Sequence, residues 1–454
     1  MGFALALAGC ASPVEQRSSP TPESGVATRA HEHDGGATAS RQQLPELKET
    51  SGLPDYLAYA ALNNPGLEAA FNRWKAALER APQASALPDP RFSYGYFIRE
   101  VETRVGPQEQ RVGVAQMFPW PGKRHLRETA AEQGAQAAQQ QYEAVRLRLF
   151  DEARQAYYEL YFLGRAIAVT TENLELLKYL EQVARAKYES GTALHGDVIK
   201  AQVELDKLRD RLRTLEDVRA PVTARLNSAL NRPAGAPLPL PAVLTPGEPP
   251  ADAVVLAARL AQTNPDLRGL DFMAAKEKAE IDLAKKEFYP DVTLGLDYTD
   301  TGSARMPGVT DSGKDAVMLS LAVNVPIWRE KYRAGVREAT SRRAATLLER
   351  RDRENRLATE LELALFKFKD SERKVALYRD ALIPKADLNL RVVQRAFEAG
   401  KADFLSLIDA ERALLEFQLT YERARADREL GLAAVDRLTG GALNQTAPEE
   451  EKQP

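Results

Sequence analysis

The chain is poor in the residues that build disulfides, metal centres and catalytic sites. Of its 454 residues, one is cysteine, Cys10, and four are histidines. A lone thiol forms no intramolecular disulfide and cannot by itself anchor a zinc site. No glycine-rich phosphate loop, nucleophile elbow or paired metal motif occurs. We therefore expect no enzyme activity, no catalytic residues, no bound metal and no cofactor.

Long apolar runs and an excess of one charge are also absent. No stretch of about 18 apolar residues occurs, so the sequence predicts no transmembrane helix. Lys and Arg number 62 against 65 Asp and Glu, which gives a net charge of −3. This balance excludes binding to nucleic acid through a basic surface. The hydrophobic content of 44% is sufficient for a folded protein.

Four segments lack periodicity. Residues 1–10 resemble a bacterial lipoprotein signal, because small residues precede Cys10, which would then be acylated; the alternative is a stray cysteine in a disordered tail. Residues 11–50 read as a disordered tether and 441–454 as a disordered tail. Residues 232–251 contain seven prolines, which predicts an extended linker.

The two regions between these segments, 53–231 and 252–440, are tandem repeats with a period of about 200 residues. Two matched pairs of motifs carry this interpretation: Asn64-Pro65-Gly66-Leu67 with Asn264-Pro265-Asp266-Leu267, and Tyr188-Glu189-Ser190-Gly191 with Phe397-Glu398-Ala399-Gly400. The first pair lies at an offset of 200 and the second at 209, and most of the difference is explained by one loop insertion in the second repeat. This period is too long for a solenoid.

Each repeat contains two short segments in which apolar and polar residues alternate, and these predict β-hairpins at about 91–118 and 291–326. The apolar positions are Phe92, Tyr94, Tyr96, Ile98, Val112, Val114, Val292, Leu294, Leu296, Tyr298, Val317, Leu319, Leu321, Val323 and Val325. Such alternation over about 9–11 residues is typical of bilayer-spanning strands with one lipid face and one wet face. The alternative is a pair of ordinary hairpins on a soluble core.

Aromatic residues favour the membrane interpretation. They gather at one end of the predicted hairpins, as the interfacial aromatic residues of membrane barrels do. The members of this group are Phe118, Trp120, Phe288, Tyr289 and Trp328.

Long helical segments follow each hairpin. The expected helices are 122–190, 196–231, 329–399 and 403–439. A helix of roughly 69 residues would span about 100 Å, and its heptad-like apolar stripe favours coiled-coil packing over an ordinary core helix. Pro221 and Pro384 lie inside these segments and predict a kink or a break.

This plan resembles the TolC family of outer-membrane efflux channels over about residues 53–440. The segment Gln116–Lys123 is similar to the strand-to-helix exit of heavy-metal-type members. Gly191 and Gly400 resemble the two helix-tip turns of the family, and residues 410–440 resemble a typical family ending. The fold class expected is mainly α with a membrane β-barrel part, built from a duplicated β-hairpin and long helical hairpin.

The resemblance implies a homotrimer in which four strands per protomer close a twelve-stranded barrel in outer-membrane lipid, above an α-helical periplasmic tunnel. The helix tips would dock a periplasmic adaptor of an inner-membrane RND pump. The channel would be a passive conduit for exported substrate, and family type favours metal cations over drugs. The sequence itself does not name the cargo.

The resemblance also supplies candidates for a periplasmic gate, which family members commonly close with a ring of aspartates. Asp197 and Asp409 lie near the tip glycines. They are not repeat equivalents, because an offset of 209 places Asp197 over Ser406 and Lys200 over Asp409. The alternative is that both are solvated residues near helix starts, favoured there by the helix dipole. His31-Glu32-His33-Asp34 could bind a metal loosely, but in a flexible tail we interpret it as incidental.

Two other functions remain open at this point. A periplasmic adaptor also has long helical hairpins, but it would have one hairpin flanked by lipoyl-like and barrel halves. A soluble coiled-coil scaffold would lack the alternating strands and the aromatic group.

Overall fold

The computed structural model describes residues 47–48 and 50–441. The predictions for Cys10, for the segment His31–Asp34, for most of the 11–50 tether and for nearly all of the tail lie outside the described residues.

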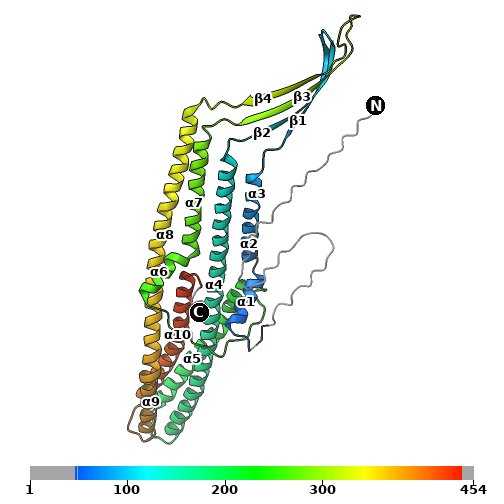
Figure 1. Cartoon of the computed structure of the whole chain (residues 1–454). Helices are drawn as coiled ribbons and strands as arrows, with labels where there is room; N and C mark the ends of the chain where they lie inside the picture. The colour runs from blue at the N-terminus through cyan, green and yellow to red at the C-terminus, as the bar shows by residue number, and fades with distance from the viewer. Residues whose placement is uncertain (1–46, 49, 442–454) are drawn as a thin grey trace, which may run out of the picture. The chain divides into compact units, whose positions relative to one another are not determined.

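The two repeats share one plan, with helices first, then two strands, then long helices (Figure 1). The first repeat contains α1 (Leu53–Asn63), α2 (Pro65–Leu78), α3 (Arg80–Ser85), β1 (Arg91–Thr103), β2 (Gly106–Phe118), α4 (Lys123–Glu189) and α5 (His195–Ala229). The second contains α6 (Ala253–Thr263), α7 (Pro265–Lys286), β3 (Val292–Thr301), β4 (Ala316–Val323), α8 (Arg329–Leu377), the π-helix η1 (Tyr378–Leu382), α9 (Ile383–Glu398) and α10 (Phe404–Leu438). The predicted fold of a duplicated β-hairpin and long helical hairpin is confirmed.

The repeated Asn-Pro motif joins the start of one helix to the end of another. Asn64 caps α2 by accepting a hydrogen bond from the Leu67 amide at 3.1 Å, and its own amide donates to the Ala229 carbonyl at the end of α5 at 3.1 Å. Asn264 does the same at the start of α7, where its amide donates to the Leu438 carbonyl of α10 at 3.0 Å. The proline that follows fits the first helical position, since no partner is needed there for an N–H.

The two prolines inside the long helices behave differently. Ahead of Pro384, α8 passes into the π-helical turn η1 before α9 begins, which accommodates a residue without an N–H. Of the kink or break expected at Pro221, the break does not occur, because α5 continues through this residue. Asp217, four residues earlier, is exposed, so water can reach the carbonyl that loses its helical partner.

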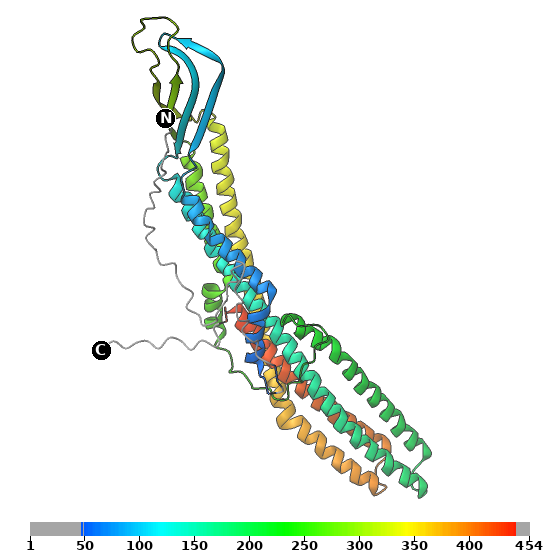
Figure 2. The ribbon, with the colours of Figure 1, turned by 90° about the vertical axis from the view of Figure 1, so that its right-hand side faces the viewer.

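The helices pack through narrow apolar stripes. On α4 the predicted stripe is buried over Leu149, Ala153, Ala156, Leu160 and Leu163, each at most 5% exposed. Near the helix tips α4, α5, α9 and α10 share one core cluster, and Figure 2 shows these four helices side by side. No helix among the described residues is long and apolar enough to cross a membrane.

All four strands form one antiparallel sheet in the order β1-β2-β3-β4. The central pair, β2 with β3, joins the two repeats through a register that runs from Phe118 opposite Val292 to Gln108 opposite Thr301. The outer strands β1 and β4 each have one edge that pairs with no strand of the described residues.

The close contact of α8 with α10 predicts the cost of one substitution. A Cβ added to Gly431 would lie 3.0 Å from both the Cα and the N of Phe368. We expect Gly431→Ala to lower the free energy of unfolding by about 1–3 kcal/mol, because the backbone of α8 would have to move. Guanidinium unfolding in detergent measures this.

Gly335→Ala is the matched control. A Cβ at Gly335, inside α8, meets nothing within 4 Å. That variant should be neutral or stabilised by up to about 1 kcal/mol, since alanine is the better helix former. Equal effects of the two substitutions would contradict the tight α8–α10 contact.

Candidate functional site

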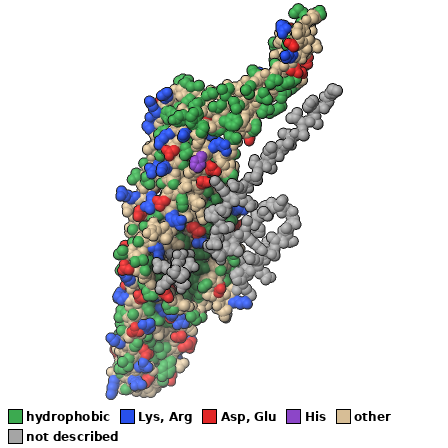
Figure 3. Space-filling view, in the orientation of Figure 1, with side chains coloured by type: hydrophobic (Ala, Val, Ile, Leu, Met, Phe, Trp, Pro, Cys, Tyr) green, Lys and Arg blue, Asp and Glu red, His purple; other side chains and the backbone are tan. Residues whose placement is uncertain are grey.

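One face of the sheet is apolar across all four strands. The register aligns Phe92, Val114, Leu296 and Leu319 in one row, and Tyr94, Val112, Tyr298 and Val317 in the next. Most of these side chains are exposed, from 44% for Tyr298 to 78% for Leu319. Figure 3 shows hydrophobic side chains gathered over the strands. The predicted alternation is confirmed, and among the described residues this face packs on none of the core clusters.

The opposite face carries mostly small and polar side chains. Ser93, Gly113 and Asp297 form one row there, which Met318 of β4 completes, and Arg111 pairs with Asp297 at 3.1 Å. A Cβ at Gly113 would lie 2.3 Å from a carboxylate oxygen of Asp297, so any larger residue there would require the Asp297 side chain to move. The two faces therefore suit two different surroundings.

A buried lysine ties the sheet to the helices. Gly122, with φ +90°, turns the chain from β2 into α4, and Lys123 follows as the first residue of the helix. Its side chain is 1% exposed, and its ammonium contacts Asp291 at 2.9 Å, Glu287 at 3.2 Å and the Tyr289 carbonyl at 3.1 Å. These oxygens come from the segment that links α7 to β3, so one cation joins the strand-to-helix exit of the first repeat to the helix-to-strand entry of the second.

The five predicted aromatic residues lie at this junction. Trp120 stacks on Tyr289 with ring centroids 5.1 Å apart, and Phe288 lies 5.5 Å from Tyr332. Trp328 and Phe118 are 73% and 41% exposed. Sequence reasoning missed that Tyr94 and Tyr298 lie in one row of the apolar face, away from this junction. The alternation contained these tyrosines, but only the strand register aligns them.

The far ends of the helices are closed by two equivalent glycine turns. Gly191 has φ +72° and Gly400 has φ +74°. In each turn an amide just beyond the glycine donates back to the helix, from Thr192 to the Lys187 carbonyl at 2.8 Å and from Lys401 to the Ala396 carbonyl at 2.7 Å. This is the pattern of a helix ended by a left-handed residue, which explains the glycine in both repeats.

The two candidate gate aspartates lie beyond these turns in unequal settings. Asp197 is in the first turn of α5, is 17% exposed and contacts Lys200 at 3.3 Å. Asp409 is 60% exposed, lies further into α10 and contacts Arg412 at 3.4 Å. The alternative interpretation, attraction to a helix start, therefore fits only Asp197.

Two further polar residues near the tips were missed by sequence reasoning. Asp403 caps α10 by accepting a hydrogen bond from the Ser406 amide at 2.9 Å, and bonding to Ser406 lowers its pKa. Arg412 donates to Glu204 of α5 at 3.1 Å, which links the two repeats. An aspartate three residues before Ser406 could have indicated the cap. No local pattern indicates a pair that is 208 residues apart in sequence.

Sequence reasoning also missed a set of charged side chains that link α4 to α10 away from the tips. Glu422, 4% exposed, accepts from the Tyr161 hydroxyl at 3.1 Å and from Arg165 at 3.0 Å. Arg154 contacts Asp436 at 2.7 Å. These carboxylates hold the two repeats together, and each is already paired with an arginine of the same chain.

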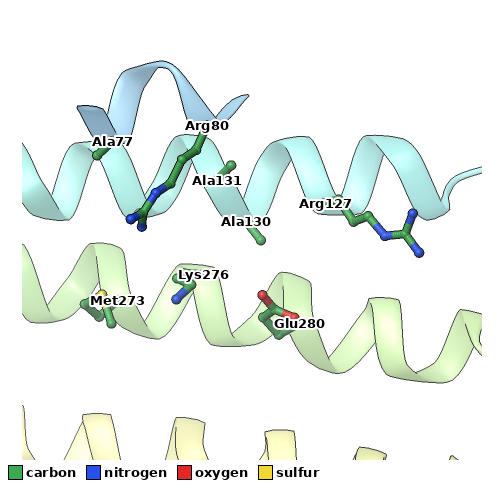
Figure 4. A pocket seen from close by; sticks show the side chains of 9 residues that line it. Ala77, Arg80, Arg127, Ala130, Ala131, Met273, Lys276 and Glu280 are labelled. Atoms are coloured by element: carbon green, nitrogen blue, oxygen red, sulfur yellow. The ribbon is translucent and has the colours of Figure 1, made fainter. Parts of the chain in front are cut away.

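A pocket of about 320 Å³ opens between α3, α4 and α7 (Figure 4). Arg80, Arg127 and Lys276 line it with a single carboxylate, Glu280. Such a lining attracts anions and offers few ligands to a metal cation. Over the part of the chain that the structure describes, no group of three or more His, Cys, Asp or Glu side chains could hold a metal ion.

These features define a protein of two equivalent halves. Their β-hairpins form one sheet with an apolar face, and their long helices end in two equivalent tips. The family of outer membrane efflux proteins matches residues 57–232 and 256–441. The chain belongs to this family. The match covers both repeats, and it gives no support to the adaptor alternative.

The curated relatives include the cobalt-zinc-cadmium resistance protein CzcC of Cupriavidus metallidurans, which is 21% identical over 85% of this chain and 88% of its own length. Protein CyaE of Bordetella pertussis is 26% identical over 76% of this chain and 74% of its own. Among solved structures, the outer-membrane channel OprN covers 86% of this chain and 90% of its own at 21% identity, with a TM-score of 0.72. CusC has the same TM-score at 15% identity, over 85% and 91%. These structures support the fold.

The junction of sheet and helices generates a prediction. Lys123→Met should lower the free energy of unfolding by about 3 kcal/mol, because it leaves the largely buried carboxylate of Asp291 without its cation. Urea unfolding in detergent measures this effect.

Arg127→Met is the control. Arg127 reaches the same Glu287 at 3.6 Å but is 40% exposed, so its removal should cost less than about 1 kcal/mol. A Lys123 variant as stable as the Arg127 variant would show that the junction does not depend on the buried cation.

Proposed function

We propose that the chain is a protomer of the outer-membrane exit channel of a tripartite efflux pump, a passive conduit for exported substrate. The observation that carries the proposal is the continuous sheet with one apolar face, one polar face and two unpaired edges. Such a sheet needs lipid on one side, water on the other and further strands at its edges.

Three protomers satisfy these needs. In lipid, unpaired backbone groups on β1 and β4 would each cost several kcal/mol, and pairing β4 of one protomer with β1 of the next removes both edges. A homotrimer with four strands per protomer thus closes a twelve-stranded barrel. The apolar positions of β1 run from Phe92 through Tyr94 and Tyr96 to Ile98, each more than half exposed, as expected of a strand with one face in lipid.

The helices would form the periplasmic tunnel below the barrel. The face of α8 and α9 that the other described residues leave uncovered carries exposed apolar side chains suited to contact with a neighbouring protomer. They are Leu348, Leu363, Phe366, Leu388 and Val392, each more than half exposed.

The tips at Gly191 and Gly400 are the proposed docking point for the periplasmic adaptor of an inner-membrane RND pump. Leu194 and Leu405, close to these glycines, are 75% and 50% exposed. Exposed apolar residues beside two rigid turns suit contact with a protein partner. The proposed lipid anchor is Cys10, which would hold the N-terminal end of the chain at the membrane.

For the cargo we propose metal cations rather than drugs. The support is similarity to a cobalt-zinc-cadmium resistance protein and the fold shared with CusC. The described residues contain no metal-ligand cluster, which suits a conduit that releases its cargo. The inner-membrane pump would then determine which substrate is exported.

The oligomer and its location provide the first test. We expect the full chain in outer-membrane extracts, at three times the protomer mass after cross-linking, because only closure removes the strand edges. Cys10→Ser should abolish incorporation of labelled fatty acid. A monomer in the soluble periplasmic fraction would contradict the channel.

The gate provides the second test. If Asp197 and Asp409 face the closed end, three-fold symmetry makes each a ring of carboxylates that attracts cations. Replacing both with alanine should raise single-channel conductance in planar bilayers and relieve block by divalent cations. Asp206→Ala on α5, whose carboxylate is 74% exposed, is the control and should leave both unchanged. Unaltered conductance and block in the double variant would refute the gate.

A further inference from the structure

A cavity of about 450 Å³ separates α5 from α10 above the helix tips. Its charged lining comes from Glu204, Lys207 and Arg211 of α5 and from Glu411 and Arg412 of α10, while α4 contributes Leu177. The cavity lies between elements of different repeats, so any change in its charges acts on the contact between the repeats.

Glu411 is the one residue of this lining whose carboxyl group is deeply buried without a complete set of partners. It is 2% exposed, and its Oε1 has no hydrogen-bond partner. Burial, with the nearby Glu204 carboxylate adding to it, raises the pKa of Glu411 to about 7, against a smaller opposing effect of Arg412. Near neutral pH a buried carboxyl of this kind gains or loses its proton readily.

The other repeat shows how the same position is satisfied without a charge. An offset of 209 places Gln202 over Glu411. Gln202 donates from its amide to Glu181 of α4 at 3.3 Å. A protonated Glu411 is similar in shape and charge to this glutamine, whereas an ionised one requires a cation.

The cations around the cavity are not equally available. Arg412 is engaged with Glu204 at 3.1 Å and with Asp409 at 3.4 Å, and Lys207 is engaged with Glu204 at 2.9 Å. Arg211 is exposed at the cavity wall and makes no ion pair with a described residue. It is therefore the cation that an ionised Glu411 can recruit.

We propose that Glu411 is a proton-operated switch on the contact between α5 and α10. Protonated, it lies neutral in the cavity, and the Glu204–Arg412 pair alone links the two helices there. Ionised, it binds the guanidinium of Arg211 and draws α5 toward α10. The link to conduction rests on the channel function proposed above: a second tie between the repeats holds the helix tips closed, so the closed state is favoured when Glu411 is ionised.

Infrared titration of the full-length protein in detergent tests the switch without reference to conduction. A protonated-carboxyl band should disappear with a midpoint near pH 7 in the wild type. It should be absent from Glu411→Gln, which has the neutral amide found at Gln202. Glu416→Gln removes an exposed carboxylate from the same helix and should keep the band. Persistence of the band in Glu411→Gln, or a wild type whose carboxyl groups all titrate near their ordinary pKa, would overturn the switch.

Conductance in planar bilayers tests the consequence. The open fraction of the wild type should fall roughly tenfold as pH rises through neutrality, the effect expected of one charge-assisted hydrogen bond. Glu411→Gln should stay at the acid value, and Arg211→Gln should do so while retaining the infrared band. A pH response unchanged in both variants would refute the Arg211 tie. If the wild type forms no channels at all, the proposed function fails, and the infrared titration alone decides on Glu411.

Discussion

The antiparallel pairing of β2 with β3 is the constraint on which the rest of the structure depends. It fuses two hairpins that are about 200 residues apart in sequence into one sheet. Only this register brings the apolar residues of both repeats onto one face, because a slip of one residue would move half of them to the polar side. The long helices then start from one shared junction, where Lys123 neutralises carboxylates of the second repeat.

Polar contacts also join the helices, both within each repeat and between the repeats. Asn64 and Asn264 each fasten the start of one helix to the end of another in the same repeat. Contacts between repeats are ionic at the tips, through Glu204 with Arg412, and near the middle of α4, through Glu422 with Arg165. Apolar stripes supply the packing, whereas these polar contacts fix which helices lie together.

Features that depend on local periodicity or backbone conformation could be predicted from the sequence. The alternation predicted the strands and their apolar face, and Gly191 and Gly400 predicted the tip turns, because left-handed turns favour glycine. The buried Lys123 and the charge pairs between repeats could not be predicted, since a charge in sequence does not name its partner. A break at Pro221 was expected but does not occur. The effect of a proline inside a helix depends on whether water reaches the carbonyl that loses its hydrogen bond, which the sequence does not tell. The protonation state of Glu411 could not be predicted either, because it depends on burial by three packed helices.

The central claim is that the apolar face of the sheet contacts lipid while the opposite face contacts water. Spin labels placed one at a time along β4, from Ala316 to Val323, in the protein reconstituted into bilayers, test it most directly. Accessibility to oxygen should peak at Val317, Leu319 and Leu321, and accessibility to a water-soluble nickel complex should peak at the positions between them. Uniform exposure to the nickel complex along the strand would contradict the account.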